Sequence, residues 1–184
     1  MRLMRDSTSA LRGNLGWGPL LVGLLLGLAA AFVDLGNAAA AQPDACRLLS
    51  DAQVHSLAPS LGKGRKSKAN IPNVSGCVWP DVHGIPGLML QVTPAPSGSL
   101  RDDLASGFGA MGYDIESVSG LGDEAAVAVQ QANPKYGIKS GVAILSVRKG
   151  KRVLSLSPAR IDVKPGSARY KRLKELAAEA ISHL

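Results

Sequence analysis

The stretch Gly120-Leu121-Gly122-Asp123-Glu124-Ala125 joins two segments with strand-like patterning and decides how the chain passes between them. Gly120 and Gly122 predict a tight turn, because glycine adopts positive φ without steric cost. Asp123 is placed to hydrogen-bond the backbone of its own turn. Ala125 then begins an apolar segment that reads as a strand over 125–129, although a run so rich in alanine also fits a helix. We assign Gly120, Gly122 and Asp123 a structural role.

The next two segments, 142–148 and 152–156, predict a β-hairpin. Both alternate apolar and polar residues with the period of two that is typical of half-buried strands. With a two-residue loop at 149–150, Leu145 faces Leu154 across the pair. One face of the hairpin is strongly apolar, and the other mixes apolar side chains, Val142 among them, with serine and arginine. We expect that second face to be half covered by a helix or partly wet.

The remaining elements are short and alternate in kind along the chain. They are helical turns within 44–61 that include a capping box from Ser50 to Gln53, a hairpin of 76–79 with 88–93, a helix from Ser99 to Met111, a strand over 113–118, and a closing amphipathic helix from Ser167 to Leu184. This order predicts an α+β fold with an antiparallel sheet packed between helices, an α/β/α sandwich, in a single domain.

The first 41 residues have the layout of a secretory signal. Three arginines precede an uncharged apolar run over 20–33, and small residues end at Ala41, after which we place cleavage. A retained anchor is the alternative, because 17–33 approaches the roughly 20 residues that span a bilayer. Either reading puts an exported globular domain, 42–184, outside the cytoplasm. It is then secreted or periplasmic, or membrane-anchored if the leader is retained.

The exported domain contains two cysteines, Cys46 and Cys77, which an oxidising compartment favours joining as a disulfide. Trp79 follows closely and is expected to be a core anchor beside the bridge. A lipid-modified Cys46 does not fit, because the apolar run ended at Val33. We predict no metal site, because the three histidines have no ligand spacing between them.

Two stretches match cofactor-binding sequence patterns, but the elements expected around them differ from those that such sites require. The glycine-rich stretch 107–112 follows a helix, whereas a dinucleotide fingerprint follows a strand. Within 120–125, Asp123 and Glu124 stand where a pyrophosphate needs bare backbone N–H groups. We therefore predict no cofactor and assign no catalytic residue. The alternative enzyme reading is a small hydrolase or transferase that uses Asp123 or Glu124.

The basic residues are the most plausible functional feature. The whole chain carries a net charge of +7. The exported domain, 42–184, has 18 Lys and Arg and 12 Asp and Glu, which gives it a net charge of +6. We predict that they attract an anionic partner, namely an envelope polymer, lipid headgroups or an acidic protein. Nucleic acid is disfavoured, since no aromatic residues are interleaved with the lysines. Besides 169–174, the candidate anion-binding residues are Lys63, Arg65, Lys66, Lys68, Arg148, Lys149, Lys151 and Arg152.

In the order of its short motifs, this chain resembles a family of small exported bacterial proteins of unknown function. The motifs are Cys46 with Leu48-Leu49, then Cys77-Val78-Trp79, then 120–125, then Val147-Arg148-Lys149-Gly150 and a closing amphipathic helix. Many relatives are lipoproteins, whereas this chain lacks the lipid-attachment context. The element order is also similar to PsbP-like α/β/α sandwiches. The resemblance implies a binding or sensing module and supplies no functional residues.

These observations together predict an exported, non-catalytic binding or interaction module of the bacterial cell envelope. The enzyme reading above is one alternative, and a structural subunit of an envelope complex is another.

Overall fold

The structure is a computed structural model that describes residues 42–68, 71–133, 135 and 140–184. The predicted leader, 1–41, and part of the turn predicted after strand 125–129 lie outside the described residues. The described residues belong to one compact unit. Within them, no helix combines the length and the apolar character needed to cross a membrane.

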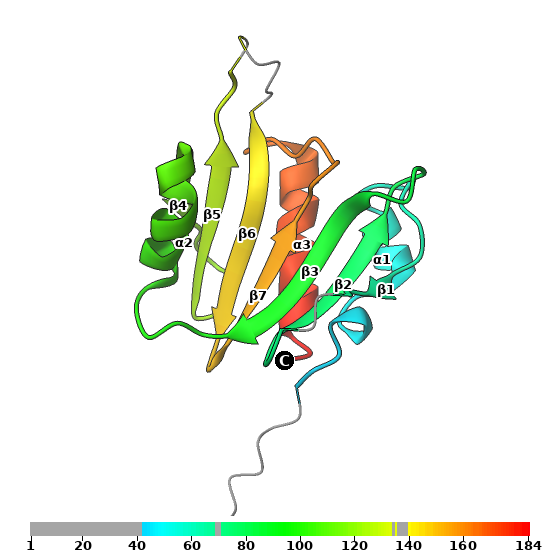
Figure 1. The fold of residues 1–184 in the computed structure, drawn as a ribbon, viewed down its shortest axis with the longest axis horizontal. Coiled ribbons are helices and arrows are strands. Elements are labelled where there is room, and N and C mark those ends of the chain that lie inside the picture. Colours follow the sequence, from blue (N-terminus) through cyan, green and yellow to red (C-terminus); the bar gives the residue numbers. More distant parts are fainter. Residues whose placement is uncertain (1–41, 69–70, 134, 136–139) are drawn as a thin grey trace, which may run out of the picture. The chain divides into compact units, whose positions relative to one another are not determined.

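The described part of the chain forms one antiparallel sheet of seven strands in the order β1-β2-β3-β7-β6-β5-β4 (Figure 1). The strands are β1 Arg65–Lys66, β2 Ser75–Pro80, β3 Pro86–Pro94, β4 Tyr113–Ser117, β5 Glu124–Gln130, β6 Gly141–Lys149 and β7 Arg152–Ser157. Strands β2 and β3 form a hairpin, β4 to β7 form a meander, and the pairing of β3 with β7 joins the two. The segment 125–129 is therefore a strand, not a helix.

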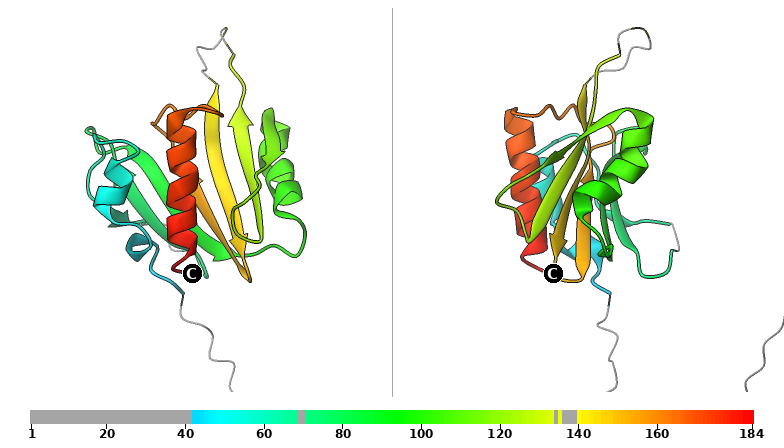
Figure 2. Two further views of the ribbon diagram at one scale, coloured as in Figure 1. Left: turned by 180° about the vertical axis from the view of Figure 1, so that it is seen from behind. Right: turned by 90° about the vertical axis from the view of Figure 1, so that its left-hand side faces the viewer.

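Helices lie on both faces of this sheet (Figure 2). They are η1 Ala45–Arg47, α1 Asp51–His55, α2 Leu100–Phe108, η2 Gly109–Met111 and α3 Ala168–Ile181. One face packs against α3, η1 and α1, and the other against α2. Helix α2 contacts β4, β5 and β6, so it covers only one side of its face. The α+β fold with helices on both faces of an antiparallel sheet is confirmed.

The main core lies between the sheet and α3. Alternate residues of β3, β6 and β7 point to this side and are fully buried, Leu90, Leu145 and Leu156 among them. They meet Leu173 and Leu176, which lie three residues apart on α3. Each such leucine stabilises the fold by about 1.5–3 kcal/mol relative to an exposed one. The Ser167 side chain caps α3 at Tyr170 N–H, as the sequence predicted.

The register of the β6–β7 hairpin differs from the prediction. Leu145 pairs with Leu156 and Lys149 pairs with Arg152, so the two-residue loop is Gly150-Lys151. Gly150 has φ +56°, and Lys151 does not have positive φ. This is the pattern of a type II′ turn, which requires glycine at its first central position. The predicted loop at 149–150 placed glycine second and lay one residue too early, so the strand pairing differs by two residues. A shift of two leaves the side chains of 144–149 and 152–156 on their expected faces.

A β-bulge in β6 alters one side-chain placement. Ala128 pairs with Ile144, but Val129 pairs with Val142, so Ala143 is the extra residue. Val142 consequently points into the main core, whereas the strict alternation had put it on the opposite face. That opposite face holds Ile144 against α2 and is only partly covered, as expected.

The disulfide between Cys46 and Cys77 is present and ties η1 to β2. Trp79 is 1% exposed, and its Nε1–H donates to Asp51 Oδ1 at 2.9 Å. The same oxygen accepts a hydrogen bond from Gly64 N–H at 2.8 Å. The prediction of Trp79 as a core anchor is confirmed. The bridge is compatible with an oxidising compartment outside the cytoplasm.

Replacing both cysteines by alanine should destabilise the domain by about 3.7 kcal/mol, the chain-entropy value for a ring of about 32 residues. Urea unfolding of residues 42–184 measures this loss. The wild-type domain under reducing conditions is the matched control and should unfold with the double variant. Coincident unfolding of the oxidised wild-type protein and the double variant would contradict a stabilising bridge.

Asp51 should contribute stability that disappears in acid. The N–H groups of Gly64 and Trp79 hold the pKa of the Asp51 carboxyl below its ordinary value of 3.8. The contribution is therefore present above the unfolded pKa and is lost as the pH falls through the lower folded pKa. Urea unfolding between about pH 5 and pH 2 should show a shallower acid loss for Asp51→Asn than for wild type. Equal slopes would refute this assignment.

Candidate functional site

Asp123, predicted to fix its own turn, instead holds the neighbouring hairpin. Its Oδ2 accepts a hydrogen bond from Gly150 N–H at 2.7 Å, and its own N–H donates to the Arg148 carbonyl at 2.9 Å. Lys149 Nζ lies 3.9 Å from Asp123 Oδ1. The hydrogen-bond partner of the Asp123 side chain therefore lies in a loop 27 residues further along the chain.

Glu124 makes the second of these attachments. Its Oε1 accepts a hydrogen bond from Leu100 N–H at 2.7 Å, and its Oε2 lies 3.4 Å from Arg148 Nη2. A carboxylate beside the first N–H groups of α2 is favourable, because those groups have no partner within the helix. Glu124 therefore caps α2 from outside, alongside the Ser99 side chain, which accepts from Asp102 N–H.

The enzyme alternative, which uses Asp123 or Glu124, stays a prediction. In this fold each carboxylate accepts a hydrogen bond from a backbone N–H group and faces a cation. Neither lines the two hollows described below on the open face of the sheet.

The eight candidate anion-binding residues do not form one cluster. Arg65 pairs with Val78 and donates to the Gly84 carbonyl at the β2–β3 turn, so it lies toward that end of the sheet with Lys63 before it. Lys66 and Lys68 continue toward the opposite end, where β2 starts. Among the cations of the β6–β7 hairpin, the Arg148 side chain is only 20% exposed and is held by Glu124 and Gly98.

Lys151 and Arg152 of the hairpin lie near Lys66, because Gln42, the first described residue, lines one hollow with Lys151 and Arg152 and another with Lys66. A hollow of about 260 Å³ is lined by Gln42, Lys151 and Arg152, together with Asn73 and Pro94. A second hollow, of about 240 Å³, has Gln42 and Lys66 in its lining. We use the name basic end for the five cations gathered at this end of the sheet, Lys66, Lys68, Lys149, Lys151 and Arg152.

Two carboxylates moderate the charge of the basic end. Lys66 Nζ lies 3.0 Å from Asp44 Oδ2, and Lys149 faces Asp123 as described. The Lys66 ammonium group, through its hydrogen bond, lowers the pKa of the Asp44 carboxyl, which therefore stays ionised in neutral solution. Both pairs are exposed, and such pairs are worth at most about 1 kcal/mol. An incoming anion can therefore compete for these lysines.

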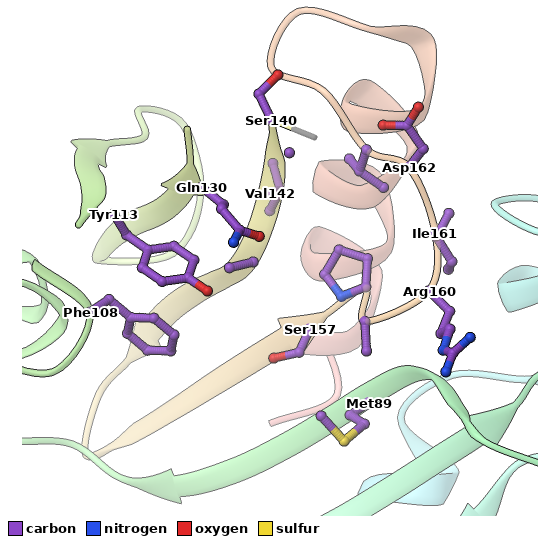
Figure 3. A pocket seen from close by; sticks show the side chains of 15 residues that line it. Met89, Phe108, Tyr113, Gln130, Ser140, Val142, Ser157, Arg160, Ile161 and Asp162 are labelled. Atoms are coloured by element: carbon purple, nitrogen blue, oxygen red, sulfur yellow. The ribbon is translucent and has the colours of Figure 1, made fainter. Parts of the chain in front are cut away.

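A larger hollow, about 550 Å³, lies on the open face of the sheet between the end of α2 and the segment after β7 (Figure 3). Its apolar surface includes Met89 and Phe108, and Phe108 packs edge-to-face against Tyr113 with ring centroids 5.4 Å apart. Its polar surface includes Tyr113, Gln130 and Ser157. The volume lies within the range of small-molecule sites.

Sequence reasoning missed this hollow because its walls come from separate parts of the chain, namely β3, α2, β4, β5, β6, β7 and the segment after β7. No local spacing links residues that meet only through sheet pairing. The one available signal was the mixed face of β6 and β7, with Ser155 and Ser157 among apolar residues. It indicated an uncovered surface but not its boundaries.

No family model, curated protein or solved structure matches this chain. The resemblance to small exported proteins and to PsbP-like sandwiches stays a prediction. In the part of the chain that the structure describes, no three His, Cys, Asp or Glu side chains are grouped as metal ligands.

Gly122→Val should destabilise the domain by about 3 kcal/mol or more, since the backbone has φ +56° and a Cβ would lie 2.3 Å from the Arg148 carbonyl oxygen. Gly120→Ala is the matched control: it has φ +77° and open space around it, so it should cost only about 1–2 kcal/mol. Urea unfolding compares the two. Equal losses would show that steric contact at Gly122 does not matter.

Proposed function

We propose that this chain is an exported, non-catalytic binding module of the bacterial cell envelope that engages an anionic component through its basic end. The disulfide supports the extracytoplasmic part of this proposal, because such bridges persist in oxidising compartments. The structural use of Asp123 and Glu124 supports the non-catalytic part.

The position of Gln42 carries the proposal. This residue follows the predicted leader directly and lines the hollows that also contain Lys66, Lys151 and Arg152. The first described residue of the exported domain therefore lies among the cations. The anionic headgroups of a membrane attract lysine and arginine near its surface by about 1 kcal/mol each. After cleavage the same cations can attract an anionic polymer.

The shared ligand chemistry is a phosphate or carboxylate group. Lys151 and Arg152 are the charged residues that line the 260 Å³ hollow, and Asn73 adds an amide. Arginine and lysine donate hydrogen bonds only, and charge-assisted bonds of this kind are stronger than neutral ones. The hollow is thus suited to an anionic group and unsuited to a cation.

Binding of residues 42–184 should be detectable on vesicles of phosphatidylglycerol and phosphatidylcholine, and on a polyglycerol phosphate polymer. It should weaken steeply between about 0.05 M and 0.5 M salt, because exposed charges are screened over a Debye length. Sedimentation measures binding to the vesicles, and titration calorimetry measures binding to the polymer. Comparing the two affinities shows whether the anionic partner is a lipid headgroup or a polymer. Neutral phosphatidylcholine vesicles should bind nothing.

The variant Lys149→Gln/Lys151→Gln should lose most of this binding. The structure places the predicted basic run 169–174 on α3, outside the basic end. Lys164→Gln/Lys171→Gln is therefore the matched control, because it removes the same charge from exposed positions before and within α3. Equal losses in the two variants would reduce the effect to net charge alone. Binding to neither anion, or binding that salt does not change, would discard the proposal.

A further inference from the structure

The open face of the sheet carries a second surface that is separate in its chemistry from the basic end. Beside the 550 Å³ hollow lies another of about 310 Å³, and Phe108 lines both. Strand β7 contributes Ser157 to the first hollow and Ser155 to the second. The two hollows therefore follow one another along β6 and β7, and we name them together the open-face groove.

The hydrogen-bonding groups of the groove are uncharged and available. The Tyr113 hydroxyl, the Gln130 amide and the Ser157 hydroxyl line the larger hollow and surround one opening in Figure 3. None of the three side chains has a hydrogen-bond partner within the described residues. Hydroxyl and amide groups both donate and accept, so they match a ligand whose own groups do the same.

The apolar part of the groove is a compact platform. Phe108 stands at the junction of the two hollows, held edge-to-face by Tyr113, and Met89 and Ala143 line the same hollow. Aromatic rings offer a flat apolar face to a ligand at low conformational cost. A ligand must therefore combine apolar surface with many hydroxyl groups.

Charge is confined to the margins of the groove. Arg160 and Asp162 line one part of the larger hollow and have opposite signs, and Asp103 lies in the smaller hollow. The exposed fraction of all three side chains is high. The floor between them offers only hydroxyl, amide and apolar groups, so a strongly charged ligand would lose hydration there without gaining a partner.

We propose that the open-face groove binds a neutral, polyhydroxylated chain, namely an oligosaccharide segment of the envelope. A sugar ring presents apolar C–H groups that fit Phe108, and hydroxyl groups that fit Tyr113, Gln130 and Ser157. Two hollows in line suit a chain of several rings better than a single one. This inference does not depend on the anionic ligand proposed above.

The experiment titrates residues 42–184 with three neutral hexasaccharides, namely maltohexaose, cellohexaose and fully N-acetylated chitohexaose, and follows amide and aromatic chemical shifts. At least one should bind at millimolar concentration or below, with the largest changes at Phe108 and Tyr113 and no dependence on salt. Gln130→Leu and Ser157→Ala should each weaken binding about three- to tenfold, as expected for one lost hydrogen bond.

Phe108→Ala should weaken binding further, and a thermal melt separates this loss from unfolding of α2. Ser182→Ala, an exposed serine at the end of α3, is the matched control and should bind as wild type does. Failure of all three sugars to bind would overturn the inference. So would binding that the Gln130 and Ser157 variants leave unchanged, or tighter binding of a carboxylated hexasaccharide.

Discussion

The loop that ends in Asp123 and Glu124 adds polar attachments to two elements that already pair with or pack on the sheet. Asp123 binds Gly150 in the β6–β7 hairpin, and Glu124 binds the first turn of α2. Arg148 links them, because its carbonyl accepts from Asp123 and its guanidinium lies beside Glu124. Gly122 must lack a side chain for the loop to approach this closely. These contacts tie β5, the β6–β7 hairpin and the start of α2 together at one end of the sheet.

The two faces of the sheet differ because the helices cover them unequally. Helix α3 and the disulfide-linked N-terminal turns cover one face, and the residues beneath them are almost all apolar. Helix α2 has nine residues, lies over β4 to β6 and reaches β7 only at Val153, which leaves the rest of β3 and β7 uncovered beside it. The uncovered part carries Gln91, Ser155 and Ser157. Ser155 pairs with the Ser146 hydroxyl, whereas Ser157 lines the larger hollow, where water or a ligand can satisfy it.

Local rules in the sequence predicted most of the fold. The capping box at Ser50 and the caps at Ser99 and Ser167 form as expected, because each depends on neighbours within three residues. The disulfide followed from composition and compartment. Two predictions about strand pairing were wrong. The β6–β7 loop has glycine at its first position and not at its second, and the bulge at Ala143 has no sequence signature. The long-range contacts of Asp123 and Glu124 could not be read locally.

The basic residues show why charge clusters in a sequence need not be clusters in space. The run 63–68 passes through β1, so its cations separate toward opposite ends of the sheet, while Lys66 and Lys151 come near Gln42 from distant segments. Carboxylates of Asp44 and Asp123 share this end and repel the anions that its lysines attract, so its net attraction for an anion is modest. Pro94 lines both the 260 Å³ hollow beside Lys151 and Arg152 and the smaller hollow of the open-face groove, so the two surfaces are adjacent. Ligand binding at the two surfaces can still be told apart by its salt dependence. Salt weakens contacts with exposed lysines and leaves hydrogen bonds to neutral hydroxyl groups almost unchanged.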